Sequence, residues 1–469
     1  MREWRVEMEK IQHMNPLETE PVGRLLRRFA VPSIISMLVG SLYNIVDQFF
    51  IGQKIGELGN AATNIAFPLN TLCIATALIF GVGGASAFNL SMGEGHKRKA
   101  VRFMGNAASM LFLGGTAITL VTLAFLRPLM LFFGSPDNVL EYAMEYTRVA
   151  ALGFPFLLLS TGGGHLLRAD GRPGMTMTCN LTGAVVNTVL DALFVFVFEW
   201  GMQGAALATA LGQIVAAILV VWGLKNCRTI KLEKKHLLPK FRYVRKILSL
   251  GFANWVNQVA MMVVQIIMNK SLKYYGSRSV YGEAVPIACS GIITKVNMLF
   301  MSFVIGLSQG LQPIAGFNYG AKNYGRVREA YRRDIICGAS LAVVAFLMFQ
   351  IFPRQIISVF GSGSEVYYQF AENYFHIFLF FTFVNFMQPI SSNFFTAIGK
   401  PVRGAFLALT RQILFLLPLI IILPLFMGID GIMYAGPAAD FLAAAVAAVM
   451  VMRELKRKEY RQDIIDIKQ

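Results

Sequence analysis

Long uncharged stretches alternate with short polar segments along the whole chain. Residues 103–126, 202–224 and 247–269 contain no Asp, Glu, Lys or Arg, and each is long enough to cross a bilayer, which takes about 20 apolar residues as a helix. Cutting the chain at charges and at Gly/Pro clusters predicts an all-α integral membrane protein with twelve transmembrane helices, at 29–51, 62–90, 103–126, 142–166, 174–198, 202–224, 247–272, 286–312, 334–353, 370–396, 403–426 and 431–452.

The two halves of the chain resemble each other. Short motifs recur 227 or 228 residues later: 201–204 (GMQG) as 428–431 (GIDG), 92–93 (MG) as 319–320 (YG), and 171–173 (GRP) as 399–401 (GKP). We therefore predict two pseudo-symmetric six-helix lobes, with an N-terminal segment 1–28, an N-lobe 29–224, a basic linker 225–246, a C-lobe 247–452 and a C-terminal tail 453–469. Such duplications build secondary transporters, in which two bundles rock around a central site. A duplication without a transport role is the alternative.

The basic residues gather in alternate loops. The chain has 43 Lys and Arg against 26 Asp and Glu, a net charge of +17, which in a soluble protein would suggest nucleic-acid binding. Here the basic clusters follow predicted helices two, four, six, eight, ten and twelve, so the positive-inside rule places these loops and both termini in the cytoplasm. We favour orientation over lipid or nucleic-acid recognition as the reason for the charge, and we predict no nucleic-acid partner.

Asp47 and Asp191 each lie inside a long apolar stretch, and an acid at membrane depth indicates a functional site. Tyr43 is four residues before Asp47, and Asn187 is four before Asp191, so each pair shares one helical face. Thr209 follows Asp191 by 18 residues with the predicted turn halfway between them. Both residues therefore lie about 13.5 Å from the turn, at matching depth on antiparallel helices.

A carboxylate, a carboxamide and a hydroxyl that converge in this way would bind a proton or Na⁺ through oxygen ligands. Burial and a second carboxylate both favour the protonated form of an acid, so a shared proton is expected, whereas hydrogen bonds from Asn187 or Tyr43 oppose protonation. The alternative is that Asp47 and Asp191 are permanently protonated and only hold helices together.

The second half carries its own charges at membrane depth, Lys295, Arg411 and Asp440. Asp440 is the acid placed to neutralise either base, and Arg411 lies on the adjacent helix of a hairpin. A structural ion pair is one interpretation of this charge network, and a cavity charge that tunes substrate choice is the other.

The remaining motifs do not indicate an enzyme. Glycines at 81, 83, 84 and 162–164 lack the strand and the lysine of a nucleotide-binding loop, so we attribute them to close helix packing. The cysteines have no metal-binding spacing. We predict no cofactor and no metal beyond Na⁺ at Asp47, Asn187, Asp191 and Thr209, and the energy source would be an ion gradient.

Four segments in the first half and one in the second resemble the multidrug and toxic compound extrusion (MATE) family, in its MepA-like bacterial branch: 42–52 (LYNIVDQFFIG), 168–173 (RADGRP), 187–191 (NTVLD), 201–209 (GMQGAALAT) and 312–320 (QPIAGFNYG). The resemblance covers about residues 20–452. It implies two six-helix lobes that form a V and export organic, mainly cationic drugs in exchange for H⁺ or Na⁺.

The resemblance also assigns roles to residues. Positions matching Asp47, Asn187, Asp191 and Thr209 form a cation site in the family, with a nearby tyrosine matching Tyr43. Pro32 matches a proline whose bending follows protonation, although the sequence alone permits Pro32 to mark the start of its helix. One departure concerns the seventh helix, where another branch has an acidic cation ligand and residues 247–269 have none. Coupling by that route is not expected.

The family further implies a monomer in the bacterial inner (plasma) membrane, crossing it many times. Its partners would be small-molecule drugs and the lipid bilayer. Two alternatives remain: a flippase for lipids or lipid-linked saccharides from the same superfamily, and a membrane scaffold that transports nothing.

Overall fold

Helices make up nearly all of this computed structural model, which describes residues 16–55, 57–135, 137–281, 284–360 and 365–457. Parts of the expected N-terminal segment (1–15) and C-terminal tail (458–469) lie outside the described residues. Eleven helices in the described part are long and apolar enough to cross a membrane, and the predicted tenth span is a pair of helical segments, Tyr367–Phe378 and Thr382–Ala397, bent by 41°. The predicted all-α membrane fold is confirmed.

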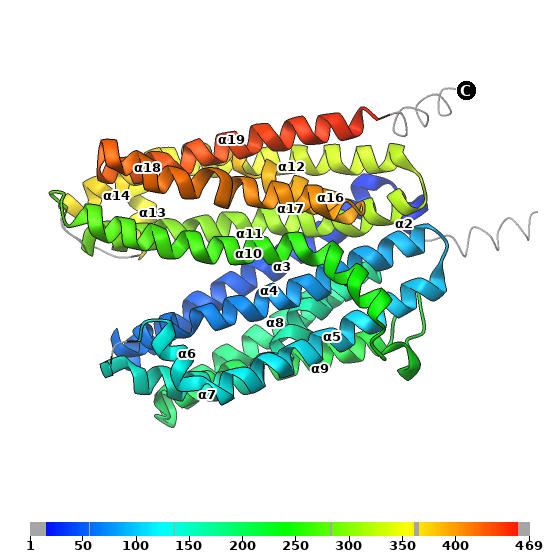
Figure 1. The fold of residues 1–469 in the computed structure, drawn as a ribbon, viewed down its shortest axis with the longest axis horizontal. Coiled ribbons are helices and arrows are strands. Elements are labelled where there is room, and N and C mark those ends of the chain that lie inside the picture. The colour runs from blue at the N-terminus through cyan, green and yellow to red at the C-terminus, as the bar shows by residue number, and fades with distance from the viewer. Residues whose placement is uncertain (1–15, 56, 136, 282–283, 361–364, 458–469) are drawn as a thin grey trace, which may run out of the picture.

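The first half contains the short helix α2 (Pro16–Thr19) and then the long helices of the lobe (Figure 1): α3 (Val22–Lys54), α4 (Glu57–Gly93), α5 (Lys97–Ala124), α7 (Asp137–Ala169), α8 (Pro173–Asp191) and α9 (Gly201–Lys225). The short α6 (Leu126–Phe132) follows α5, and a π-helix, η1 (Ala192–Val197), continues α8. A short 3₁₀ turn, η2 (Lys234–His236), lies in the linker.

The second half repeats this order: α10 (Phe241–Gly276), α11 (Ala284–Gly320), α12 (Tyr324–Ile351), α13 (Pro353–Phe360), α14 (Glu365–Phe378), α15 (Thr382–Asn385), α16 (Met387–Ala397), α17 (Pro401–Leu409), the π-helix η3 (Thr410–Leu416), α18 (Leu417–Met427) and α19 (Ile429–Leu455). The repeat extends to the backbone of the turns. Gly171 and Gly399 have φ of 81° and 75°, and Gly201 and Gly428 have φ of 55° and 60°. Glycine suits these turns because it has no Cβ to clash at positive φ.

Several helices are longer than the sequence pattern predicted, because charged residues occupy their first turns. Helix α3 begins at Val22 instead of residue 29, α10 at Phe241 instead of 247, and α12 at Tyr324 instead of 334. The basic linker is correspondingly shorter than 225–246. Cutting at charges removes the part of a helix that extends beyond the apolar core. It made Asp334 the first residue of the predicted span, whereas Asp334 lies ten residues after the start of α12.

The two halves meet through glycines at one end of the molecule. A Cβ on Gly83 of α4 would collide with the backbone carbonyl of Ile247 in α10, and a Cβ on Gly310 of α11 would lie 2.7 Å from backbone atoms of Ala30 in α3. Gly83 and Gly310 are 227 residues apart, so the same position in each half makes the same kind of crossing. Without side chains at these points the helix backbones approach closely.

Contacts between the halves continue along α3 and α11. The hydroxyls of Ser41 and Ser302 are 2.7 Å apart, and the amide of Gln309 donates to the sulfur of Met37 at 3.6 Å. At the chain's start, Arg326 of α12 donates to the carbonyl oxygen of Glu20 at 2.6 Å. The N-terminal part of the first half is thereby fastened to the second half.

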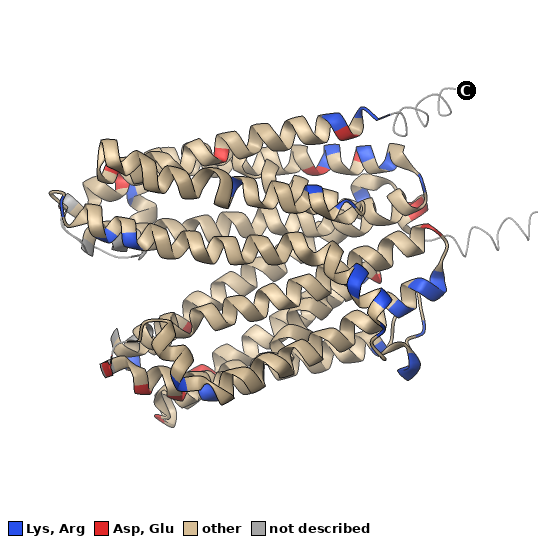
Figure 2. Ribbon diagram, viewed as in Figure 1, with Lys and Arg blue, Asp and Glu red and all other residues tan. Residues whose placement is uncertain are grey.

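Lys and Arg concentrate at the end where α2 lies and where α19 finishes, and we call this the basic end (Figure 2). The loops after α4, α7, α9, α11 and α16 are at this end. In Figure 1 the two layers of helices converge toward the basic end and diverge toward the opposite, far end. Some basic residues also lie at the far end, among them Lys54, which pairs with Glu199.

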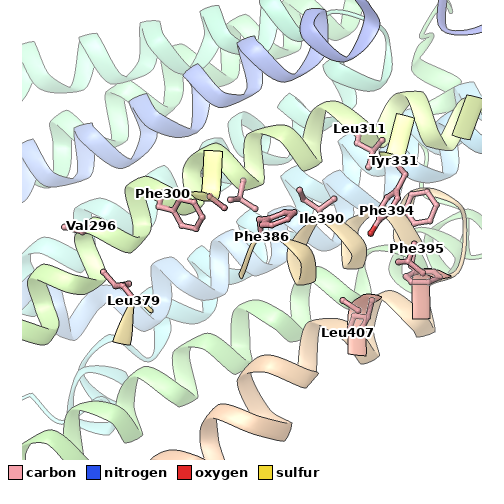
Figure 3. Close-up of a cluster of buried hydrophobic side chains, with 14 of the residues drawn as sticks. Val296, Phe300, Leu311, Tyr331, Leu379, Phe386, Ile390, Phe394, Phe395 and Leu407 are labelled. Atoms are coloured by element: carbon pink, nitrogen blue, oxygen red, sulfur yellow. The ribbon is translucent and has the colours of Figure 1, made fainter. Parts of the chain in front are cut away.

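Each half is built around an apolar core, and the core of the second half also includes Leu25 and Phe29 of α3. In the second half, buried side chains of α11, α12 and α16, and of the residue between α15 and α16, pack together. They include Phe300, Tyr331, Phe386, Ile390 and Phe394 (Figure 3). In the first half, Gly81 of α4 lies directly against the backbone of Gly162 in α7, so the glycines at 81 and 162 do serve close helix packing. The cores fix how each helix is rotated about its axis, and this rotation decides which polar groups meet.

Candidate cation-binding site

Two acids from neighbouring helices of the first half lie side by side. Asp47 is in the last third of α3, and Asp191 is the last residue of α8, where the α-helix passes into the π-helix η1. Asp191 is 1% exposed, whereas Asp47 is half-buried. The two carboxyl groups are close enough to interact directly. π-Helical turns inside α-helices often occur at functional sites.

Helix α9 supplies the hydroxyl that the sequence analysis expected. The amide of Asn187 donates a hydrogen bond to the Thr209 hydroxyl at 3.2 Å. This contact depends on the close crossing of α8 and α9, where a Cβ on Gly212 would lie 2.9 Å from Cβ of Asn187. Thr209 of α9 therefore lies opposite Asn187, and Asn187 is one turn before Asp191 on α8. The structure brings together Asp47, Asn187, Asp191 and Thr209.

Several oxygen atoms of this group have no hydrogen-bond donor among the described residues. They are Oδ1 of Asp47, both carboxyl oxygens of Asp191, and Oδ1 of Asn187, and all four atoms are buried. Buried polar atoms without a partner are rare in proteins because each costs free energy. A concentration of four acceptors in one place is the arrangement that a bound cation or proton would satisfy.

Two tyrosines lie within electrostatic range of the carboxyl groups. Tyr43 lies one turn before Asp47 and interacts with both acids. Tyr146 of α7 is also within electrostatic range of Asp47 and Asp191, and the sequence analysis missed it. The sequence around Tyr146 does not show which way its side chain points. That direction depends on how α7 is rotated about its axis, and only the structure shows it.

Two further contacts lie between the carboxyl groups and the far end. The rings of Phe50 and Phe196 meet edge to face with centroids 5.4 Å apart. Beyond them Lys54 donates a hydrogen bond of 2.6 Å to Glu199, and this bond lowers the pKa of Glu199 below its usual value. Glu199 has a φ of 56°, a conformation that non-glycine residues rarely adopt. The aromatic contact thus joins α3 to η1, and the ion pair joins α3 to the turn after η1.

Pro32 lies inside α3, ten residues after the helix begins at Val22. The sequence permitted Pro32 to mark the helix start, and that interpretation is wrong. A proline in a helix interior removes one backbone hydrogen bond, here the one to the carbonyl of Arg28. The hydroxyl of the next residue, Ser33, donates to the carbonyl of Phe29 at 2.8 Å. The helix continues through this point to Asp47.

The comparison with known sequences decides the family. The sequence model of the MatE family matches residues 32–193 and 254–422, which is more than half of the chain and includes part of each half. The chain belongs to the MatE family. The resemblance found in the sequence is confirmed, and the protein is a membrane transporter of this family, not an enzyme.

Curated relatives of this MatE protein cover almost its whole length. It is 23% identical over 447 residues to the multidrug export protein MepA of Staphylococcus aureus strain MSSA476, which covers 94% of this chain and 96% of that protein. It is 22% identical over 435 residues to MepA of Staphylococcus haemolyticus strain JCSC1435, covering 92% and 94% of the two chains.

Solved structures share the fold. One is described as the outward-facing conformation of a multidrug resistance MATE family transporter of the MOP superfamily; it superposes with a TM-score of 0.86 at 23% identity and covers 93% of this chain and 97% of that one. Another, a MOP superfamily transporter from Pyrococcus furiosus described as having a binding pocket of reverse polarity, superposes with a TM-score of 0.87 at 22% identity over 94% and 98%.

The charges in the second half of this MatE protein do not form one network in the described residues. Arg411, in the π-helix η3, donates to the carboxylate of Asp440 in α19, and their side chains are 12% and 5% exposed. Lys295 of α11 is half-buried and takes no part in this pair. The expected group of three is therefore an ion pair and a separate lysine.

A further buried acid, Asp334, escaped the sequence analysis. It is fully buried in α12, and neither carboxyl oxygen has a hydrogen-bond partner among the described residues. Tyr331 and Gly338 lie on the same helical face, and they pack against Phe394 and Phe386 respectively. Asp334 thus faces the apolar core drawn in Figure 3.

Proposed function

We propose that this protein is a secondary active antiporter that exports organic, mainly cationic compounds in exchange for H⁺ or Na⁺ by alternating access. One observation carries the proposal: four buried acceptor oxygens of Asp47, Asn187 and Asp191 lie together without a hydrogen-bond donor among the described residues. Neither acid has a basic partner there. A cation that binds and leaves is the simplest reason to keep such a group within a membrane protein.

The donor set suits either coupling ion. Carboxylate, carboxamide and hydroxyl oxygens are hard ligands for Na⁺, and Thr209 adds one to the three residues with unpaired oxygens. Two adjacent acids can instead share a proton, because two neighbouring negative charges repel each other and one proton removes the repulsion. Tyr43 and Tyr146 lie within electrostatic range of both acids, and a phenol hydroxyl can donate to a carboxylate or accept from a protonated acid.

The proposed cycle uses the geometry of the two halves. They meet through glycines at the basic end, and Asp47 lies six residues beyond Ser41 in the direction of the far end, about 9 Å along the helix. Ion uptake from the far side would rearrange α3, with Pro32 as its hinge, and would release the drug outward. Because ion and drug favour different states of one equilibrium, exchange follows from their differential affinities.

We further propose the orientation, the lobes and the assembly state. The basic end would face the cytoplasm of a bacterium, as the positive-inside rule requires, so both termini would lie on the cytoplasmic side of the plasma membrane. The N-lobe would comprise residues 29–224 and the C-lobe 247–452, extended by the early helix turns described above. The protein would work as a monomer, as the resemblance to the MATE family implies.

The experiment is export of ethidium from proteoliposomes under imposed pH and Na⁺ gradients. The unmodified protein is compared with Asp47→Asn and Asp191→Asn, which keep the shape of each side chain but remove its charge. Glu141→Gln, an exposed acid on α7 of the same lobe, is the matched control. We expect one gradient to drive export in the unmodified and control proteins, and both aspartate variants to be expressed but inactive.

The outcomes separate the alternatives. Loss of gradient-driven export in both variants supports an antiporter and identifies its ion. Export at the unmodified rate in either aspartate variant removes that residue from coupling. If neither gradient drives dye export, the flippase alternative is tested next by scrambling of labelled lipid in the same vesicles, and absence of both activities leaves the scaffold.

A further inference from the structure

A cavity of about 640 Å³ opens at the basic end where the two halves meet. We call it the junction pocket. Its lining in the first half comes from α4, the turn after α4, and α5. In the second half it comes from α10, α11, the turn after α11, the first residue of α12 and the turn after α16. Four of the lining residues are cations: Lys99, Arg242, Lys246 and Lys322.

The cations of the junction pocket are not neutralised within the described part of the protein. Glu94 is the acid in the lining, and it pairs with His96 at 3.2 Å. None of the four cationic side chains has an ion-pair partner among the described residues. The pocket therefore holds a surplus of positive charge that an anion would neutralise.

The positions of three cations are unfavourable without an anion. Lys99 and Arg242 lie in the first turns of α5 and α10, and neither helix has an acid in its first turn. The N-terminus of a helix carries partial positive charge, so cations there are repelled and anions are attracted. Arg242 and Lys246 are also four residues apart on one helix, where like charges repel.

The fourth cation occupies a strained backbone position. Lys322 has a φ of 61°, whereas the residue at the same place in the first half, 227 positions earlier, is Gly95 with a φ of 77°. The duplicated turn thus requires positive φ, and glycine adopts it without steric cost. Lysine is the less stable choice for the backbone, so its charge at the pocket is a reason for its presence.

The linker and the aromatic residues hold the pocket in shape. Asn106 of α5 accepts a hydrogen bond of 2.6 Å from the backbone N–H of Lys240, directly before α10. The rings of Phe103 and Tyr243 then meet edge to face at 5.0 Å. The start of α10, with Arg242 and Lys246, is therefore fixed relative to Lys99.

We propose that the junction pocket binds a phosphate-bearing anion and that this ligand stabilises the conformation in which the halves meet at the basic end. The positive-inside rule accounts for basic residues at this end but not for their convergence from both halves, nor for a lysine at a glycine position. Since both halves contribute cations, the complete site exists only while they are together, so its ligand shifts the equilibrium toward this state. The phosphate would come from a membrane phospholipid or from a soluble phosphate compound.

Thermal unfolding of the purified full-length protein in detergent tests the proposal. Phosphatidylglycerol, phosphatidylcholine, which has no net charge, and inorganic phosphate are added separately. We expect phosphatidylglycerol or inorganic phosphate to raise Tm and phosphatidylcholine to have a much smaller effect, because binding to the folded state alone stabilises it. A rise with phosphatidylglycerol only identifies a lipid, and an equal rise with inorganic phosphate identifies a soluble anion.

Variants locate the binding. Lys322→Gly should leave the ligand-free Tm equal or higher, because it relieves the strained turn, yet reduce the ligand-induced rise at least twofold. Lys246→Gln should reduce the rise in the same way. Lys231→Gln, an exposed lysine of the linker outside the pocket, is the matched control and should keep the full rise. No rise with either anion, or an undiminished rise in both pocket variants, overturns the proposal.

Discussion

Gly93 of α4 and Gly320 of α11 face each other where the halves of the molecule meet, at equivalent positions of the two repeats. A Cβ on Gly93 would lie 3.0 Å from the carbonyl carbon of Gly320 and even closer to the carbonyl oxygen of Phe317. A Cβ on Gly320 would in turn collide with the carbonyl oxygen of Leu90. Both neighbours are backbone atoms, which cannot move aside as a flexible side chain would.

The first prediction is that Gly93→Ala and Gly320→Ala each separate the halves at the basic end and slow transport. The distance between spin labels at Arg98→Cys and Arg328→Cys, with the native cysteines replaced, measures the separation. Gly291→Ala in α11 is the control, since nothing lies within 4 Å of its Cβ position. Label distances unchanged from the parent in both glycine variants would contradict the idea that this contact closes the basic end.

The second prediction concerns the hydrogen bond between Asn187 and Thr209. Thr209→Val keeps the shape of the side chain but removes the acceptor, and a lost hydrogen bond costs about 0.5–1.5 kcal/mol. If the hydroxyl helps to hold the coupling ion, the ion concentration for half-maximal export should rise by up to about tenfold. Ethidium export measured against ion concentration tests this. The control is Thr116→Val, a half-buried threonine of α5 whose hydroxyl donates only to the carbonyl of Phe112 in its own helix. An unchanged half-maximal concentration would show that Thr209 does not take part in ion binding.

The third prediction treats the Arg411–Asp440 pair as structural. Arg411→Leu alone leaves a buried carboxylate without its partner and should destabilise the protein by about 3–5 kcal/mol. The double variant Arg411→Leu/Asp440→Leu should recover most of this loss and keep the range of exported dyes. The exposed pair Arg333–Glu329 is the control and should contribute little. A double variant that folds but exports a different set of dyes would instead assign the pair to substrate choice.

The fourth prediction is that Asp334→Leu does not destabilise the protein. A buried polar group without a hydrogen bond costs about 1–3 kcal/mol, and Asp334 faces an apolar core, so a leucine should raise stability by up to that amount. Thermal unfolding measures the change. If Asp334→Leu lowers Tm or abolishes export, the carboxyl group has a partner or a role in another state of the transport cycle, and labelling of the acid with a carboxyl reagent during transport would then follow.

The fifth prediction uses the Lys54–Glu199 pair. Lys54 lowers the pKa of Glu199, so the pair is complete above the usual pKa of a glutamate and is lost only as pH falls through the lowered value. Between about pH 5.5 and 8, which is above the usual pKa of a glutamate, Glu199 stays charged. Glu199→Gln should therefore shift the rate of export without changing the shape of its pH profile in this range. A changed shape would link Glu199 to the transported proton.

Local properties of the chain were sufficient to predict the membrane fold and to single out two of its acids. Apolar length determines whether a helix crosses a membrane, whatever it packs against, so the spans and the repeat could be found from sequence. Asp47 and Asp191 stood out because charge is costly in apolar surroundings, and the spacing of Asn187 and Thr209 follows from helical rise. Helices with charged first turns were predicted too short. The start of α12 was therefore missed, and Asp334 was not recognised as a residue inside this helix.

Only the tertiary structure decided which of these groups meet. Whether Tyr146 faces Asp47, whether Lys295 joins Arg411 and Asp440, and whether Gly83 faces its own half or the other depend on how each helix is rotated about its axis and where it crosses its neighbours. Those quantities are set by packing between residues far apart in the chain, such as Gly183 with Gly212 or Gly93 with Gly320. The sequence therefore determined the helices and their chemistry, and packing determined the site.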